Sequence, residues 1–461
     1  MEQFIKEENI LGTEPVSKLL KMFAWPAIIS MLANSLYNII DQIFIGQAVG
    51  YLGNAATTVA FPIATIVLSL GTLLGVGSSA FAAIKLGEGN ELAAEKALNT
   101  TTLVSVVSGV VLAVGGLMFL EPLLTFFGAT ANTMTYSKEF GGIIIAITPL
   151  TILLVSLSNM ARADGSPQLS MHALVGGVLV NVVLAPLFIF VFHWGVWGAA
   201  LATAFAQVFT VSILLWYFLQ QGKMRLRREL FWTPDWNICR SFMAIGASSC
   251  LVQLGATVLQ IIMNHSLLYY GDLSQVGGDL ALSAMGIVMK INMIIISICI
   301  GIGIGAQPII GFNRGANNPS RILETYKYAV GIATAITTLG WLCFMVLPEP
   351  ILRIFGSNGE EFMAFGVLCM RVFLGGVFAA GFQLISTSYF QATGQPLKAS
   401  ILSLLRQMIL LVPLILLLPL WFGLMGILYA GVVADLVAAV LVLFFMRSEM
   451  KKLHAECLAK S

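Results

Sequence analysis

Long apolar stretches alternate with short polar connections along the whole chain. Twelve of them are long enough to cross a bilayer as α-helices, and they lack the strict alternation of a strand. They cover residues 19–46, 56–84, 97–119, 139–161, 169–192, 196–219, 240–268, 280–311, 324–347, 362–390, 397–419 and 424–446. The pattern therefore predicts an all-α polytopic membrane protein with twelve transmembrane helices.

Three short motifs of the first half recur in the second half. EPLLTFFG (121–128) returns as EPILRIFG (349–356), ADGSP (163–167) as ATGQP (392–396), and GVWG (195–198) as GLMG (423–426). The offsets of 228, 229 and 228 residues share one register. Since each half holds six spans, we predict two six-helix lobes related by a pseudo-twofold axis along the membrane normal, with a cleft between them.

The longest polar connection, GKMRLRRELFWTPDWN, lies at the midpoint of the chain and separates these halves. It suggests three parts: an N-terminal six-helix lobe (1–221), a cytoplasmic linker (222–238), and a C-terminal six-helix lobe with a cytoplasmic tail (239–461). Two lobes around a cleft are typical of transporters that open to each side of the membrane in turn.

Composition and charge agree with a membrane location. Hydrophobic residues make up 58% of the chain and charged residues only 10%, which excludes an ordinary soluble protein. Nineteen of the 24 Lys and Arg residues fall on the side of the N-terminus, which predicts a multi-pass protein of the plasma (inner) membrane with both termini cytoplasmic. The expected surroundings are a lipid bilayer, nothing points to nucleic acid, and a monomer should suffice for function.

The sequence favours an ion gradient as the source of energy. It contains no GxxxxGK[ST] phosphate-binding loop, and GIGIG (301–305) lies inside an apolar span, where glycines typically allow close helix packing. We therefore expect a secondary transporter and not an enzyme, with no cofactor beyond a proton or sodium ion.

Charged residues within the spans are expensive unless they are paired or functional. Arg406 and Asp435 lie at similar depths in the last two spans, so we predict a structural ion pair between them. Lys290 and Arg371 lie in the outer halves of their spans and have no evident partner.

Asp41, in the stretch LYNIIDQIFIG, shares its depth with no basic residue of the N-terminal half. Its expected neighbours are neutral and polar: Tyr37, Asn38, Asn181 and Thr203. A buried carboxylate without a cationic partner takes up a proton more readily than an exposed one. Because one negative charge can be neutralised by a proton or by a cationic substrate, but poorly by both, the arrangement predicts antiport.

Pro26 is the candidate hinge of the same span. Proline removes one backbone hydrogen bond from a helix and favours a kink. Protonation of Asp41 could then change how the helix bends, if the two conformers differ in proton affinity.

Several motifs together resemble the multidrug and toxic compound extrusion (MATE) family. They are ARADGSPQLS (161–170), NVVLAPLFIF (181–190), GVWGAALATAFAQ (195–207), QPIIGFNRGA (307–316) and FQATGQPLKAS (390–400). The resemblance covers nearly the whole chain, and LYNIIDQIFIG is similar to the prokaryotic branch whose cation site is in the N-terminal lobe. It implies an exporter of organic cations that exchanges them for protons or sodium. It also implies that Asp41, Asn181 and Thr203 match the coupling-cation site and Pro26 the bending proline.

One position departs from the family pattern. The motif after Asn181 usually reads N-x-x-L-D-P, whereas this chain has Ala185 in place of the second aspartate. Sodium needs several oxygen ligands and a proton needs only one base, so the change favours proton coupling, or altered or weakened coupling. A sodium ion at Asp41 remains the alternative, and the C-terminal lobe offers only Gln253 and Gln260 where another branch has an acid.

Lipophilic cations are the expected substrates. Tyr37, Asn38, Gln253 and Met285 are candidate pocket residues, and many of the 20 Met and 29 Phe residues were expected to line the cleft. Two alternatives stay open. A flippase of lipid-linked anionic precursors would use Lys290 and Arg371 in the cleft, and a transporter-derived protein with impaired coupling would fit Ala185.

Overall fold

The computed structural model describes residues 10–49, 51–127, 129, 133–353 and 360–458, with a few side chains near the ends of α2 and α3 and at the start of α12 also left out. Within these ranges the chain is helical and contains no strand. Eleven helices are long and apolar enough to cross a membrane, and one bent pair completes a twelfth span. The prediction of a twelve-span all-α membrane protein is confirmed.

The first bundle contains the helices that precede the central linker. They are α1 (Ile10–Thr13), α2 (Val16–Val49), α3 (Tyr51–Gly87), α4 (Glu91–Met118), α5 (Leu120–Phe126), α6 (Met134–Ala146), α7 (Thr148–Ala163), α8 (Pro167–Pro186), the π-helical η1 (Leu187–Val191) and α9 (Gly195–Gln220). The single helix expected over 139–161 is instead two helices, α6 and α7, which meet at 48°. Pro149, at the second position of α7, cannot donate a backbone hydrogen bond to α6, which explains the break.

The second bundle follows the short linker helix α10 (Arg228–Phe231). Its helices are α11 (Trp236–Asp272), α12 (Gly278–Gly315), α13 (Pro319–Val346), α14 (Pro348–Arg353), α15 (Glu360–Phe373), the 3-10 segment η2 (Leu374–Ala379), α16 (Ala380–Ala392), α17 (Pro396–Leu404), the π-helical η3 (Leu405–Leu411), α18 (Val412–Leu417), α19 (Pro419–Phe422) and α20 (Leu424–Leu458).

The sequence repeat is visible in the backbone. The short helices α5 and α14 occupy matching places, and left-handed glycines recur as Gly165 with Gly394 and as Gly195 with Gly423. Only glycine adopts such backbone angles without strain, so these pairs mark turns that both halves share. The two halves therefore repeat the same succession of helices and turns.

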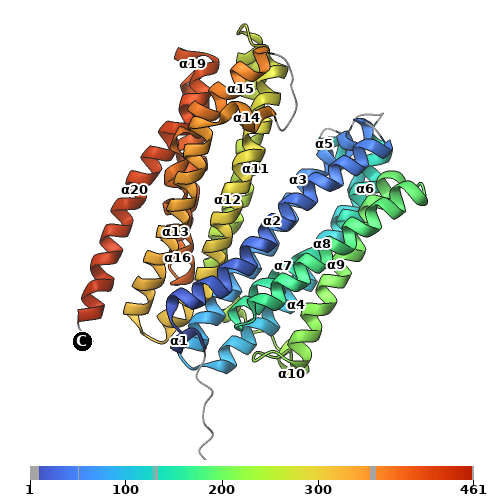
Figure 1. Cartoon of the computed structure of the whole chain (residues 1–461). Coiled ribbons are helices and arrows are strands. Elements are labelled where there is room, and N and C mark those ends of the chain that lie inside the picture. The colour runs from blue at the N-terminus through green and yellow to red at the C-terminus, as the bar shows by residue number, and fades with distance from the viewer. Residues whose placement is uncertain (1–9, 50, 128, 130–132, 354–359, 459–461) are drawn as a thin grey trace, which may run out of the picture.

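The two bundles come together at the end that carries α1 and α10, called the linker end below, and diverge toward α5 and α19 (Figure 1). Glycines make the close approach possible. A Cβ added at Gly77 or Gly246 would overlap a carbonyl oxygen of the facing helix, in α11 and α3 respectively, and Gly87 and Gly315 do the same between α3 and α12. These contacts join the bundles at the linker end.

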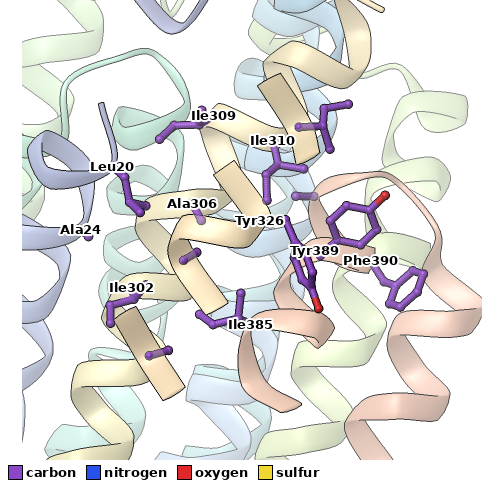
Figure 2. Packing of buried hydrophobic residues seen from close by; sticks show 14 of the residues in the cluster. Leu20, Ala24, Ile302, Ala306, Ile309, Ile310, Tyr326, Ile385, Tyr389 and Phe390 are labelled. Atoms are coloured by element: carbon purple, nitrogen blue, oxygen red, sulfur yellow. The ribbon is translucent and has the colours of Figure 1, made fainter. Parts of the chain in front are cut away.

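Helix α2 belongs to both bundles. Toward the linker end, Leu20 and Ala24 pack with Ile302 and Ala306 of α12 in a cluster that also contains Tyr389 (Figure 2). Gly301 and Gly305 of the GIGIG motif meet the backbone of this part of α2, which confirms their role in close packing. The other half of α2 lies against the first bundle, where Ile45 joins a cluster of α8 and α9.

Candidate functional site

A cavity of about 520 Å³ lies between the bundles and takes its walls from both. Helices α2, α3, α7, α8 and α9 line one side, and α11, α12, α16, α17 and η3 line the other. Many of the lining residues have polar side chains, which is unusual within helices of membrane-spanning length, while apolar atoms form most of the exposed wall. A cavity shared by two bundles, with apolar walls and several polar groups, is suited to an amphiphilic solute that leaves water to cross the membrane.

Asn181 and Thr203, the predicted partners of Asp41, both line this cavity. Asn181 is 97% buried, and its Nδ2 donates a hydrogen bond to Thr203 Oγ1 over 3.2 Å. The Thr203 hydroxyl in turn donates to the carbonyl of Ala199. The carboxamide oxygen of Asn181 makes no hydrogen bond within the described part of the chain and is available to a cation or a proton donor.

The side chains of Asp41, Tyr37 and Asn38 lie outside the described residues, although all three belong to α2. Their helix passes the cavity, which Asn34 lines one or two turns earlier. Four residues after Asp41, Ile45 is buried in one cluster with Ala185 and Ala199. The coupling role of Asp41 stays a prediction.

Ala185 occupies a buried, apolar position. Its side chain is completely buried among Ile45, Phe188 and Ala199, one turn beyond Asn181 on α8. An aspartate at this place would lie between α2 and α9, so its absence leaves apolar packing where the family pattern has an acid. Among the described residues, no three His, Cys, Asp or Glu side chains gather into a metal site.

The other predicted pocket residues are divided between the cavity and the core. Gln253 lines the cavity from α11. Met285 is 99% buried in the hydrophobic core of the second bundle, beside Val288 and Phe365, and the prediction that it lines the pocket does not agree with this placement. Residues of α15 pack in the same cluster, and apolar side chains that face a core or a cleft look alike in sequence.

The predicted ion pair is present. Arg406 Nε donates to Asp435 Oδ1, joining η3 to α20. Asp435 reaches this place because Gly376 of η2 has no side chain, and its Cβ packs directly on the glycine. Arg406 also lines the cavity, so the pair holds one charged wall in position.

Lys290 and Arg371 are exposed, and neither lines the cavity between the bundles. The aromatic lining expected from composition is also not found. Among the described lining residues there is one methionine, Met31, and no Phe, Tyr or Trp. That expectation was wrong for this cavity, whose walls offer amides and hydroxyls.

Three polar residues of the cavity were not predicted from the sequence. Arg162, which directly follows the span expected over 139–161, is buried in the last turn of α7 and lines the cavity. Gln307 donates to Gln391 Oε1 over 2.8 Å, and Gln391 donates to the hydroxyls of Ser248 and Ser249. These amides connect α12, α16 and α11 across the cavity floor. Gln307 lies within the expected span 280–311, but Arg162 and Gln391 directly follow the spans 139–161 and 362–390, so a search for polar residues within spans passes them by.

Known proteins resemble this chain over nearly its full length. The MatE family model matches residues 26–187 and 249–417. A curated relative, the multidrug export protein MepA of Staphylococcus haemolyticus (strain JCSC1435), is 26% identical over 458 residues and covers 98% of each chain. Among solved structures, "Crystal structure of MATE in the bent conformation" is 22% identical with a TM-score of 0.89, covering 96% of this chain and 98% of that one. "Outward-facing conformation of a multidrug resistance MATE family transporter of the MOP superfamily" is 23% identical with the same TM-score and the same coverage.

The fold and the shared cavity define a polytopic membrane protein built like a transporter of two lobes. The chain belongs to the MatE family, because the family model covers well over half of its residues.

Proposed function

We propose that this protein is a secondary active exporter that exchanges lipophilic organic cations for protons across the plasma membrane, with both termini in the cytoplasm. The observation that carries the proposal is the cavity shared by both bundles in a MatE family chain, with apolar walls and polar groups from each bundle. The relative MepA is named a multidrug export protein, which supports the same activity. Both described ends of the chain, α1 and the end of α20, lie at the linker end, as the charge distribution requires (Figure 1).

Exchange follows from competition for one negative charge. Asp41 is the proposed base, and the Asn181–Thr203 pair supplies neutral polar atoms on the neighbouring helices. A proton or an organic cation each neutralises the carboxylate, so the binding of one displaces the other. Release to opposite sides then requires the cavity to open in turn at each end.

Proton coupling is favoured over sodium coupling by the surroundings of Ala185. Sodium prefers several oxygen ligands, and the site that would hold a second carboxylate is filled by apolar packing. A proton needs one base and no such cage. Broad substrate choice then rests on the size of the cavity and its many amides and hydroxyls, in place of aromatic faces.

A flippase of anionic lipid precursors that uses Lys290 and Arg371 is disfavoured, because neither residue lines the cavity; the cations that line it are Arg162 and Arg406 among the described residues. The other alternative is a transporter-derived protein with impaired coupling. The efflux experiment below tests it, because such a protein would not export the dye in response to an ion gradient.

The test is ethidium efflux from cells that express the protein, with the proton and sodium gradients collapsed separately. We expect efflux to stop when the proton gradient is collapsed and to continue without a sodium gradient. Asp41→Asn should reduce efflux to the level of cells without the protein, while Glu139→Gln, which neutralises an exposed acid, should keep it. Efflux that survives Asp41→Asn, or that depends only on sodium, would reject the proposal.

A further inference from the structure

Arg162 is a buried cation at the floor of the cavity, in the last turn of α7. Its side chain is 95% buried. Nη1 donates to the hydroxyls of Ser158 and Ser170 over 3.1 and 2.7 Å, and Nη2 donates to Asn159 Oδ1 over 2.9 Å. All three partners are neutral. Across the described part of the chain, no carboxylate oxygen lies within 4.0 Å of its guanidinium.

Such a charge is costly in a membrane protein. Burying an ion without a counter-charge loses its hydration, and hydrogen bonds to neutral groups recover only part of that loss. A guanidinium carries five N–H donors, of which three are used here, and Nε donates to no acceptor among the described residues. The residue therefore retains both an uncompensated charge and free donors.

The position is open to a ligand and shared by both bundles. Arg162 lines the main cavity and also a small hollow of about 10 Å³ with Asn159, Ser79 and Gln307. Ser79 and Gln307 are 228 residues apart, the interval of the sequence repeat, so they are matching residues of the two halves. A ligand held by Arg162 would touch both bundles at the place where they meet.

The repeat shows that the charge is specific to the first bundle. Gln391 stands 229 residues after Arg162, before the second copy of the turn motif. It is neutral and fully occupied by Gln307, Ser248 and Ser249. The fold can thus be built at this position with an uncharged amide, and the buried guanidinium is not a requirement of the turn.

We propose that Arg162 is an anion-binding site of the cavity, which takes a small monovalent anionic group through its free guanidinium donors. The group is either a free halide or the carboxylate of a zwitterionic amphiphile. Arginine suits both, since it binds carboxylates with paired hydrogen bonds and stays charged at any physiological pH.

The site is separate from the cation site of the proposed function. Ser170, which contacts Arg162, precedes Asn181 by eleven residues on α8, about 16 Å along a helix. An amphiphile with a cationic and an anionic end could therefore span the cavity between Asp41 and Arg162. This extension to substrates rests on the proposed function, whereas binding of a free halide does not.

The first experiment uses chloride as the probe. Purified full-length protein in lipid nanodiscs is unfolded by heat in sodium chloride and in sodium gluconate of equal ionic strength. A bound anion stabilises the folded state, so the midpoint temperature of unfolding should be higher in chloride than in gluconate. Arg162→Gln, which copies Gln391, should remove the difference. Arg240→Gln, which removes an exposed cation at the start of α11, should keep it.

The second experiment compares tetramethylrhodamine, which carries a free carboxylate, with its methyl ester. Binding is followed by fluorescence anisotropy in gluconate. Loss of an ion pair should weaken binding of the acid by about tenfold in Arg162→Gln and leave binding of the ester within about twofold. Arg162→Lys keeps the charge but loses the paired geometry, so its affinity for the acid should lie between that of the wild type and that of Arg162→Gln.

Each outcome decides between sources or rejects the site. A chloride effect alone identifies a free halide, and selective loss of the acid alone identifies a substrate carboxylate. If Arg162→Gln does not fold, the wild type still answers, because chloride should then compete with the acid and not with the ester. No chloride effect and no acid preference would overturn the proposal. Since both readouts measure binding, failure of transport would leave them intact.

Discussion

At the scale of single residues, the lining of the cavity presents neutral polar groups and a few charges at defined places among its apolar residues. Asn181 and Thr203 form a hydrogen-bonded pair, and Arg406 is held by Asp435. Sequence reasoning predicted these residues because polar groups within apolar spans are conspicuous. It misplaced Met285 and the aromatic residues, because in a membrane protein the lipid-facing, core-facing and cleft-facing sides of a helix can all be apolar.

Ala185→Asp should make transport depend on sodium. A second carboxylate at this buried place would add oxygen ligands beside the helix that carries Asp41, which favours a metal cation over a proton. The measurement is dye efflux at matched proton gradients with and without sodium. Ala185→Asn controls for the added volume, since the site has no spare space. Equal transport of the folded aspartate variant in both media would contradict our interpretation of Ala185.

At the scale of elements, twelve spans and one repeat could be predicted, but not the irregularities within the spans. The bend at Pro149 follows from a missing backbone hydrogen bond, and Gly376 of the 3-10 segment packs on Asp435, so neither feature is recorded by hydropathy. The π-helical η3 was likewise not predicted. The attachment of the linker was not predicted from the sequence either. The linker appears in the sequence as a polar connection obeying the positive-inside rule, whereas the structure fastens it to the first bundle.

Asp164, in the turn between α7 and α8, accounts for much of this attachment. Its carboxylate accepts hydrogen bonds from Tyr217 Oη and from the backbone amides of Lys223 and Met224. Burial raises the pKa of the carboxyl, and the three hydrogen bonds act against that rise. The second bundle has Thr393, a neutral residue, in the matching place.

Asp164→Asn should release the linker. Asparagine replaces one accepting oxygen with an amide NH2 group, which cannot accept, so at least one of the three bonds is lost, at a cost of about 1–3 kcal/mol. Trypsin should then cut faster after the linker residues Lys223 and Arg225 in the purified protein. Glu229→Gln removes an exposed charge of the same linker and should change nothing. Unchanged cleavage of Asp164→Asn would show that other contacts hold the linker.

At the scale of the whole molecule, glycines let the two bundles meet closely at the linker end and leave the cavity between them. The contact of Gly246 with the carbonyl of Leu73 leaves no room for a side chain. Sequence offered the glycines but not their partners, which belong to the other half of the chain. The bundles are thus in contact at the linker end and apart at the other end, an arrangement that fits one of the two states of the proposed exchange.

Gly246→Ala should disfavour this state. The added methyl would collide with backbone that cannot turn aside, which costs about 1–3 kcal/mol and should lower the midpoint of thermal unfolding together with dye efflux. Gly331→Ala is the matched control, because a Cβ there meets nothing within 4 Å and alanine favours a helix. Equal stability and transport in the two variants would show that the contact is not needed.

The most direct test of the exchange mechanism is proton release from purified protein when a cationic substrate binds. In a weakly buffered solution near neutral pH, addition of ethidium to the wild type should release protons with the same midpoint as dye binding. Asp41→Asn should release none. Proton release from Asp41→Asn equal to that of the wild type, or dye binding by the wild type without any release, would contradict competition for a single carboxylate.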